Sequence, residues 1–138
     1  MKEDFVTYEQ SVKLKELGFD WEVVHFYDKW NGKLCENQIS YDWEPGPHES
    51  VYFDINGDTM FNIGFSAPTL AQVQKWLRET KDIHIEIKYT YNPQYEPWVG
   101  KVITLNNGEY IETDTCDTYE EALLECIDKS IEILENDK

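Results

Sequence analysis

The residues best suited to chemistry are a histidine and a carboxylate two positions apart, His84 and Glu86. A His-x-Glu pair occurs in zinc deaminases, where the glutamate moves protons and a following Pro-Cys-x-x-Cys segment completes the metal site. No such segment follows here, and the other two histidines, His25 and His48, have no carboxylate at a metal-binding spacing. An exposed strand face is therefore the simpler interpretation, and a small hydrolase or nuclease using His84 and Glu86 is the alternative.

Two further carboxylates, Asp54 and Asp58, flank an Asn-Gly pair and resemble the start of a calcium-binding loop. The segment departs from the EF-hand pattern, because its glycine is fourth instead of sixth and Phe65 stands where the bidentate glutamate belongs. We interpret it as a hairpin turn and expect no metal there. The same two carboxylates are the other candidate acid or base groups of a hydrolase or nuclease.

The three cysteines, Cys35, Cys116 and Cys126, form no Cys-x-x-Cys pair and stand in no recognisable catalytic context. This pattern predicts reduced thiols in a cytoplasmic protein. Cys126 lies close to an apolar helical stripe and is predicted to be a small core residue. The sequence contains neither a glycine-rich phosphate loop nor a Gly-x-Ser-x-Gly elbow, so we predict no catalytic residue and no cofactor.

The charge of the chain is strongly negative, with 12 basic and 28 acidic residues and a net charge of −16. Such a field repels nucleic-acid phosphates and anionic membranes, so we expect neither as a partner. It would attract a basic protein, or it would serve only to keep the chain soluble. No apolar run reaches the ~18 residues of a membrane span, and the charged start predicts a cytoplasmic location. The oligomeric state is left open.

Acidic and aromatic residues alternate between Leu34 and Gln74, where the sequence has no Lys or Arg. Two interpretations of this stretch stay open. The aromatic side chains belong to amphipathic strands and face inward, or they form a docking surface for a basic partner. The aromatic residues that are hardest to bury by pattern are Trp30 and Trp43. We predict that these two residues, with Tyr41 and Glu44, contact a protein partner.

Three helix starts are marked by Thr-x-x-Gln or Thr-x-x-Glu segments that begin at Thr7, Thr69 and Thr118. In each segment the hydroxyl can cap the third amide while the Gln or Glu side chain reaches back, which is worth about 1 kcal/mol. The first helix should end near Leu17, before Gly18. The last should run from Tyr119 to about Leu134 with an apolar stripe along one side.

Strands are predicted between the helices, because three Asn-Gly pairs each mark a tight hairpin turn. The hairpins would join 23–28 to 33–39, 51–55 to 59–65, and 99–105 to 109–113. A further strand with alternating apolar and polar residues is expected from Ile83 to Tyr91. The sequence therefore predicts an α+β fold, a mostly antiparallel sheet with three helices packed on it, in a single domain, 1–138.

Three segments carry a resemblance to a known family: 4–19, 67–79 and 117–122. Their sequences resemble those of small acidic proteins of gut Bacteroides-type bacteria and of their phages and mobile elements, for which no activity is assigned. The resemblance implies a cytoplasmic protein of phage or mobile-element type, and it implies no catalytic residues. The arrangement of elements is also similar to small phage proteins described as alpha-beta-alpha sandwiches, and the segment 117–123 resembles the strand-to-helix part of Hic-type antitoxins.

Together these observations predict a small non-catalytic accessory protein that acts by protein–protein contact. The alternatives are an antitoxin-like or nucleic-acid-mimicking inhibitor of a basic partner, and the hydrolase or nuclease described above.

Overall fold

The computed structural model describes residues 4–19, 21, 23, 25–28, 31–36, 51–53, 60–62, 64–91 and 97–137. The chain forms two compact units. The N-terminal unit is Phe5–Thr69, and the C-terminal unit is Leu70–Lys138 together with Met1–Asp4.

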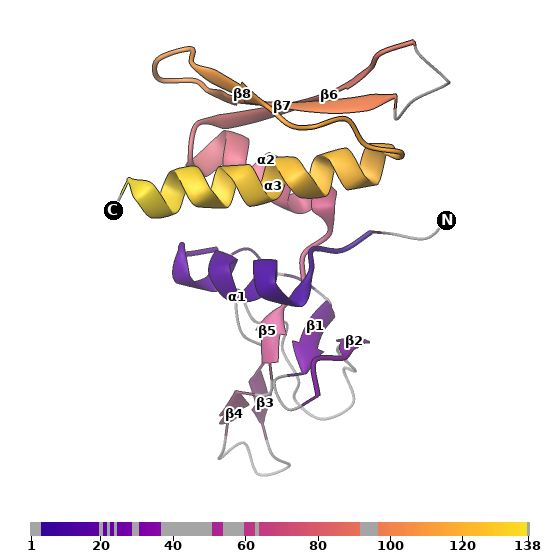
Figure 1. The fold of residues 1–138 in the computed structure, drawn as a ribbon. Coiled ribbons are helices and arrows are strands. Elements are labelled where there is room, and N and C mark those ends of the chain that lie inside the picture. The colour runs from indigo at the N-terminus through magenta and orange to yellow at the C-terminus, as the bar shows by residue number, and fades with distance from the viewer. Residues whose placement is uncertain are drawn as a thin grey trace. The chain divides into compact units, whose positions relative to one another are not determined.

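In its described residues, the N-terminal unit contains one helix and five short strands: α1 (Tyr8–Glu16), β1 (His25–Asp28), β2 (Leu34–Glu36), β3 (Val51–Phe53), β4 (Met60–Asn62) and β5 (Gly64–Ser66) (Figure 1). Strands β2, β1 and β5 form one antiparallel sheet in that order, and β3 pairs with β4 in a second one. The helix α1 packs against β5.

Helix α1 begins and ends where its local sequence predicts. The Thr7 hydroxyl accepts a hydrogen bond from the Gln10 amide (3.1 Å), and the Gln10 side chain accepts one from the Thr7 amide (3.0 Å). This reciprocal pair satisfies two amides that the first turn of a helix leaves without partners. Gly18 follows the C-cap with a φ of +91°, a conformation that favours glycine.

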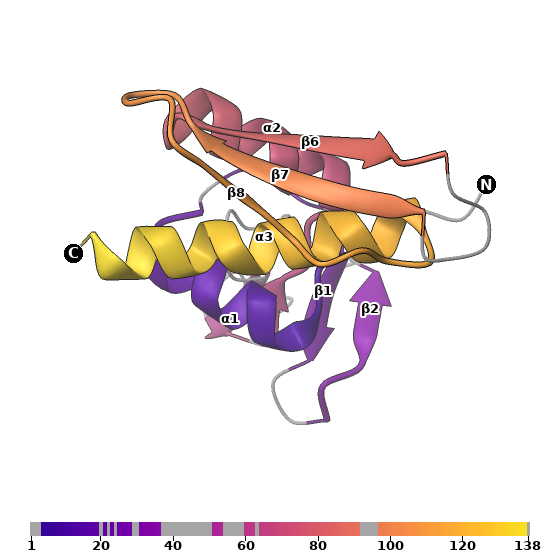
Figure 2. The ribbon, with the colours of Figure 1, turned by 45° about the horizontal axis from the view of Figure 1, so that its top comes forward.

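The part of the C-terminal unit that the structure describes contains two helices and three strands: α2 (Leu70–Thr80), β6 (Ile83–Tyr89), β7 (Trp98–Thr104), β8 (Tyr110–Glu112) and α3 (Tyr119–Asn136). The strands form an antiparallel sheet in the order β6-β7-β8. Both helices lie on the same face of this sheet (Figures 1 and 2). Helix α2 packs on β6, whereas α3 packs mainly on β7.

The core of the C-terminal unit lies between the sheet and these helices. Its buried side chains come from α2, from the inner faces of β6 and β7, and from one stripe of α3: Leu70, Val73, Trp76, Leu77, Ile83, Ile85, Val102, Ala122, Leu123, Cys126, Ile127 and Ile131. Gly100 lets β7 approach α3 closely, because a Cβ atom built on it would lie 2.2 Å from the Cys126 Sγ.

The α+β class, the antiparallel pairing and the three helices confirm the predicted fold. The first and third Asn-Gly hairpins are confirmed with their turns, since Gly32 and Gly108 have φ values of +71° and +74°. The strands of the second hairpin also pair. Its Asn-Gly turn lies outside the described residues. The single domain, 1–138, stays a prediction.

The structure corrects two details of the predicted strands. The segment expected as one strand over 59–65 contains β4 and β5, and β5 pairs with β1 instead of β3. In this position the Phe65 ring meets the Tyr8 ring of α1 edge-on, with ring centroids 5.8 Å apart. The apolar face expected up to Tyr91 also ends early. Tyr91 follows β6 with a φ of +63° and is 85% exposed.

Candidate functional site

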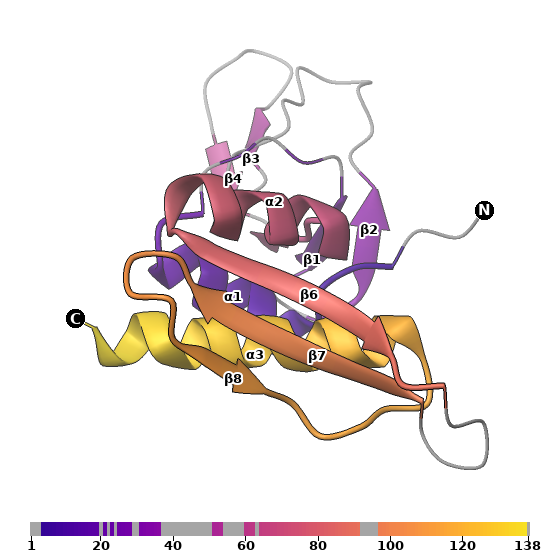
Figure 3. The same cartoon turned by 90° about the horizontal axis from the view of Figure 1, so that it is seen from above.

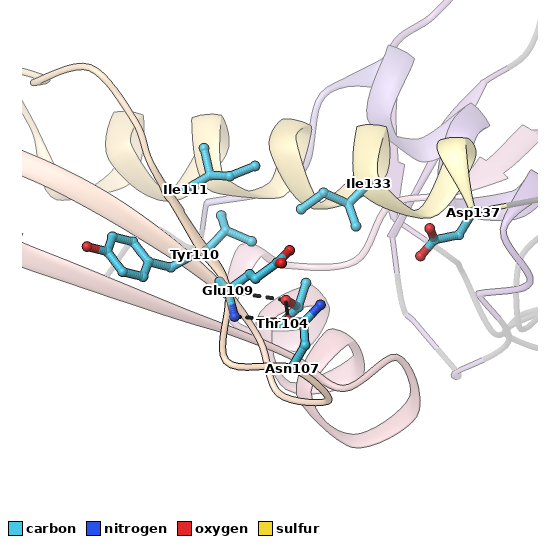
Figure 4. A pocket seen from close by; sticks show the side chains of 8 residues that line it. Thr104, Asn107, Glu109, Tyr110, Ile111, Ile133 and Asp137 are labelled. Carbon is cyan, nitrogen blue, oxygen red and sulfur yellow. Dashed lines mark hydrogen bonds between the residues drawn. The ribbon is translucent and has the colours of Figure 1, made fainter.

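A hollow that combines apolar and acidic groups lies between the β7–β8 hairpin and the end of α3. We call it the hairpin–helix groove. Its volume is about 230 Å³. It is lined by Val102, Thr104, Asn107, Glu109, Tyr110 and Ile111 of the hairpin and by Ile133 and Asp137 of the helix end. Figure 4 shows Ile133 and the Glu109 carboxylate pointing into the space between hairpin and helix.

The turn of the hairpin fixes one wall of the groove. The Asn107 side-chain oxygen accepts hydrogen bonds from the Glu109 amide (2.9 Å) and from the Thr104 hydroxyl (2.5 Å), as Figure 4 shows. The Thr104 amide donates to the Glu109 carbonyl (2.9 Å), and the Leu105 amide donates to the Asp82 carbonyl (2.8 Å). These bonds tie the turn both to itself and to the start of β6. Glu109 is therefore held at a defined place on the groove rim.

The floor of the groove is apolar, and it is open to solvent because β8 extends beyond the helices. Residues 109 and 111 share the inner face of the strand, since side chains alternate. Helix α3 packs on β7 and β6, and neither described helix packs on β8 to a comparable extent. Ile111 is consequently 44% exposed, although it lies on the same face as the buried Val102 opposite it. Ile133 of α3 is half-buried and forms the opposite side of the floor.

The groove is acidic at both ends. Among the described residues, the carboxylates of Glu109 and Asp137 have no Lys, Arg or His side chain within ion-pair distance. The last turn of α3 contains no basic residue, and Lys138, which comes next, lies outside the described residues. A helix C-terminus already carries a partial negative charge and normally attracts basic side chains. Glu135 and Asp137 add to that charge, so this helix end would stabilise a cation from another molecule.

The size of the groove limits what it can hold. Small-molecule sites usually span about 300–1,000 Å³, so a volume of about 230 Å³ suits one or two side chains better than a cofactor. In the part of the chain that the structure describes, no three His, Cys, Asp or Glu side chains gather as metal ligands. The arrangement therefore fits an apolar side chain between Ile111 and Ile133 with basic groups beside Glu109 and Asp137.

Most of the residues singled out from the sequence cannot be placed. The predicted contact residues Trp30, Tyr41, Trp43 and Glu44 lie outside the described residues, and so do Asp54 and Asp58. Their roles stay predictions.

His84 and Glu86 lie on the outer face of β6, where the His84 Nε2 is 3.6 Å from the Glu86 Oε1. Their side chains are 35% and 54% exposed, and neither lines the groove. The separation is longer than the ~2.6–3.2 Å of a working proton transfer. The pair matches the solvent-exposed strand face that alternation predicts, and the hydrolase or nuclease alternative stays a prediction.

The cysteines are free thiols, and two of them are buried. Cys126 is fully buried under β7, as predicted for a small core residue. Burial, with smaller contributions from the nearby Glu125 carboxylate and from Cys116, raises the pKa of its thiol to about 12. Cys126 therefore stays protonated at neutral pH and is a poor nucleophile.

A second feature that the sequence did not predict is a row of four aromatic rings in the C-terminal unit. Tyr91, Tyr89, Trp98 and Tyr119 follow one another edge-to-face, with ring centroids 5.4, 5.2 and 5.5 Å apart. Such contacts stabilise neighbouring rings by about 0.5–1.5 kcal/mol each. The row joins the end of β6 and the start of β7 to the start of α3, so it contributes to the packing of this unit.

The groove residues were missed because they come from separate segments. The hairpin and the last helix were each predicted, but their side chains meet only in the folded unit. One local signal was present in the sequence. Acidic residues lie at and just beyond the predicted end of the last helix, namely Glu132, Glu135 and Asp137, where a stable helix end favours basic ones.

No protein-family model matches the sequence, and neither a curated protein nor a solved structure matches the chain. Among the described helices, none combines the length and the apolar character needed to cross a membrane.

Proposed function

We propose that this chain is a non-catalytic accessory protein that acts by protein–protein contact, and that the hairpin–helix groove receives a basic segment of its partner. The observation that carries this proposal is the combination of an apolar floor, Ile111 and Ile133, with two unneutralised carboxylates, Glu109 and Asp137, at an acidic helix end.

Two contributions to the binding free energy would act together in the groove. Covering Ile111 and Ile133 with an apolar side chain removes apolar surface from water, at about 25 cal/mol per Å². Partly exposed ion pairs to the two carboxylates add about 0.2–1 kcal/mol each and speed the encounter through the −16 net charge. Together they favour a partner that carries both basic and apolar side chains over a purely basic one.

The proposal is tested with a defined probe, a synthetic peptide in which Lys and Val alternate with Thr (Thr-Lys-Thr-Val, twice). Its affinity is measured by calorimetry for the wild type and for Glu109→Gln combined with Asp137→Asn. Loss of two ion pairs should weaken binding by about 2- to 30-fold. Binding should also weaken as ionic strength rises.

The matched control removes two negative charges elsewhere, by Glu79→Gln combined with Glu120→Gln on exposed positions of α2 and α3. It should bind the peptide nearly as well as the wild type does. A peptide with Glu in place of Lys should not bind. Equal weakening by both double variants would show that only the overall charge matters, and the groove would then have no role.

A sharper form of this function is an inhibitor that masks the basic surface of a nucleic-acid-binding protein. The support for it is the charge of the whole chain, which resembles that of a polyanion. It predicts that the protein competes with nucleic acid for its partner, which a displacement assay with labelled DNA measures directly.

A further inference from the structure

The outer edge of β8 offers backbone groups that pair with no described residue. The Thr104 amide donates to the Glu109 carbonyl (2.9 Å), and the Thr113 amide donates to the Gly100 carbonyl (2.8 Å). In an antiparallel strand the backbone amides and carbonyls of alternate residues point to the same neighbouring strand. The backbone groups of residues 109, 111 and 113 therefore point towards β7. The amides and carbonyls of Tyr110 and Glu112 therefore point away from the sheet, along the free edge seen in Figure 3.

The opposite edge of the same sheet, formed by β6, is covered by a side chain from a helix. On β6, the Ile85 carbonyl accepts a hydrogen bond from the side-chain amide of Gln74 (3.1 Å), which comes from α2. A helix thus protects that edge from pairing with another strand. No described element covers β8 in this way.

The free edge has defined limits. At one end it stops at the turn around Gly108. At the other end, Gly100 pairs with Thr113 but Trp98 pairs with Cys116, so two residues of one strand stand opposite one residue of β7. Such a bulge ends regular pairing. The edge can therefore pair with a short extended segment, but it is too short to pair with a long strand.

We propose that the partner's basic segment binds as an added strand beside β8, extending the sheet over the hairpin–helix groove. This inference rests on the proposed function and gives it a binding mode. Residues of the added strand opposite Tyr110 and Glu112 would bond to the free backbone groups and point outward. The residues between them would point inward, with an apolar side chain over Ile111 and a basic one beside Glu109.

The pattern expected of the partner is therefore a basic and an apolar residue two positions apart, in an extended segment. A second copy of this chain fits poorly, because residues 109–113 contain two glutamates and no Lys or Arg, so β8 of another copy would bring no basic side chain beside Glu109.

The test uses the Thr-Lys-Thr-Val peptide, which carries Lys and Val at this spacing in either direction. Hydrogen exchange of the backbone amides is measured by NMR with and without the peptide, together with the methyl signals of Ile111 and Ile133. We expect exchange at Tyr110 and Glu112 to slow at least tenfold when the peptide is bound, while the two methyl signals shift.

Two modified peptides provide the matched comparison without altering the protein. Methylating the backbone nitrogens of the Thr residues removes the donors that would face β8, whereas methylating those of Lys and Val leaves these donors intact. The first peptide should lose at least tenfold in affinity relative to the second.

The outcomes separate the two proposals. Methyl shifts at Ile111 and Ile133 without slower exchange at Tyr110 and Glu112, or equal affinities of the two methylated peptides, would overturn strand addition and leave the groove as the binding site. Absence of both methyl shifts and slower exchange would overturn both.

Discussion

Replacing Gly100 by alanine should destabilise the C-terminal unit through one identifiable clash. The new Cβ would lie 2.2 Å from the Cys126 Sγ and 3.2 Å from both the Ala122 carbonyl oxygen and the Thr113 Oγ1, whereas ordinary contact begins at 3.4 Å. The sulfur would have to move by more than 1 Å, and Cys126 is fully buried with no solvent-facing space.

The expected size of the effect follows from two opposing terms. Overpacking a core costs about 1–3 kcal/mol, and the upper end applies here because the neighbours on α3 are backbone or buried. Alanine is favoured over glycine in a strand interior by about 0.5–1 kcal/mol. We therefore expect Gly100→Ala to lower the free energy of unfolding by about 2 kcal/mol. Urea unfolding followed by far-UV circular dichroism and by tryptophan fluorescence, to which the buried Trp76 contributes, measures this change.

A double-mutant cycle identifies the cause. Cys126→Ala removes the clashing sulfur, so Gly100→Ala should cost little in that background, with a coupling of about 1–2 kcal/mol. Gly108→Ala is the matched control, because its Cβ would meet nothing within 4 Å and its cost comes only from the φ of +74°. That cost should be the same with or without Cys126. Additive effects of Gly100→Ala and Cys126→Ala would refute the reasoning.

Three further predictions follow from single features. Folding raises the pKa of the Cys126 thiol from 9.0 to about 12, so the unfolded chain loses the thiol proton at a lower pH than the folded one. The free energy of unfolding should therefore fall as pH rises from 9 towards 12, by up to about 1.4 kcal/mol per pH unit. In urea unfolding, Cys126→Ala should show a shallower fall. Thr7→Ala should lower the free energy of unfolding by about 0.5–2 kcal/mol in the same assay, and Thr7→Ser should restore most of it. Asp137→Asn should raise the free energy of unfolding by about 0.3–1 kcal/mol, because it removes a negative charge from a helix C-terminus; a loss of stability would show that Asp137 has a compensating partner.

The local elements of this fold could be read from the sequence because their determinants are neighbours in the chain. The Thr7 cap, the Gly18 stop and the Asn-Gly turns each depend on two to four consecutive residues. One detail differs at the start of α3, where Thr118 caps as predicted but the Glu121 carboxylate accepts from the Asp117 amide (3.3 Å), one residue earlier than expected.

The groove could not be read in this way, because its parts are related only through packing. The sequence showed that Ile111 belongs to an apolar strand face, but not that β8 extends beyond both helices and leaves this residue exposed. It also showed an acidic helix end without showing which strand lies beside it. The pairing of β5 with β1 was not predicted for the same reason, because the two strands lie far apart in the chain.

Under the proposed function, the acidic end of α3 exchanges stability for binding at this position. Two carboxylates near a helix C-terminus weaken the helix slightly, and a basic partner would reverse this effect. Residues that break a local rule in this way are expected to concentrate at functional sites. The expected rise in stability of Asp137→Asn, together with its loss of affinity, would show both sides of the exchange in one variant.

The central claim, that the groove binds a basic partner, is tested most directly by site-specific photocrosslinking in the native cells. A photoreactive amino acid replaces Ile133 on the groove floor, or Glu79 on an exposed face of α2 as a control. The account predicts an adduct with a basic protein from position 133 that is absent from position 79 and is reduced by Glu109→Gln combined with Asp137→Asn. Equal adducts from both positions, or none from position 133, would contradict it.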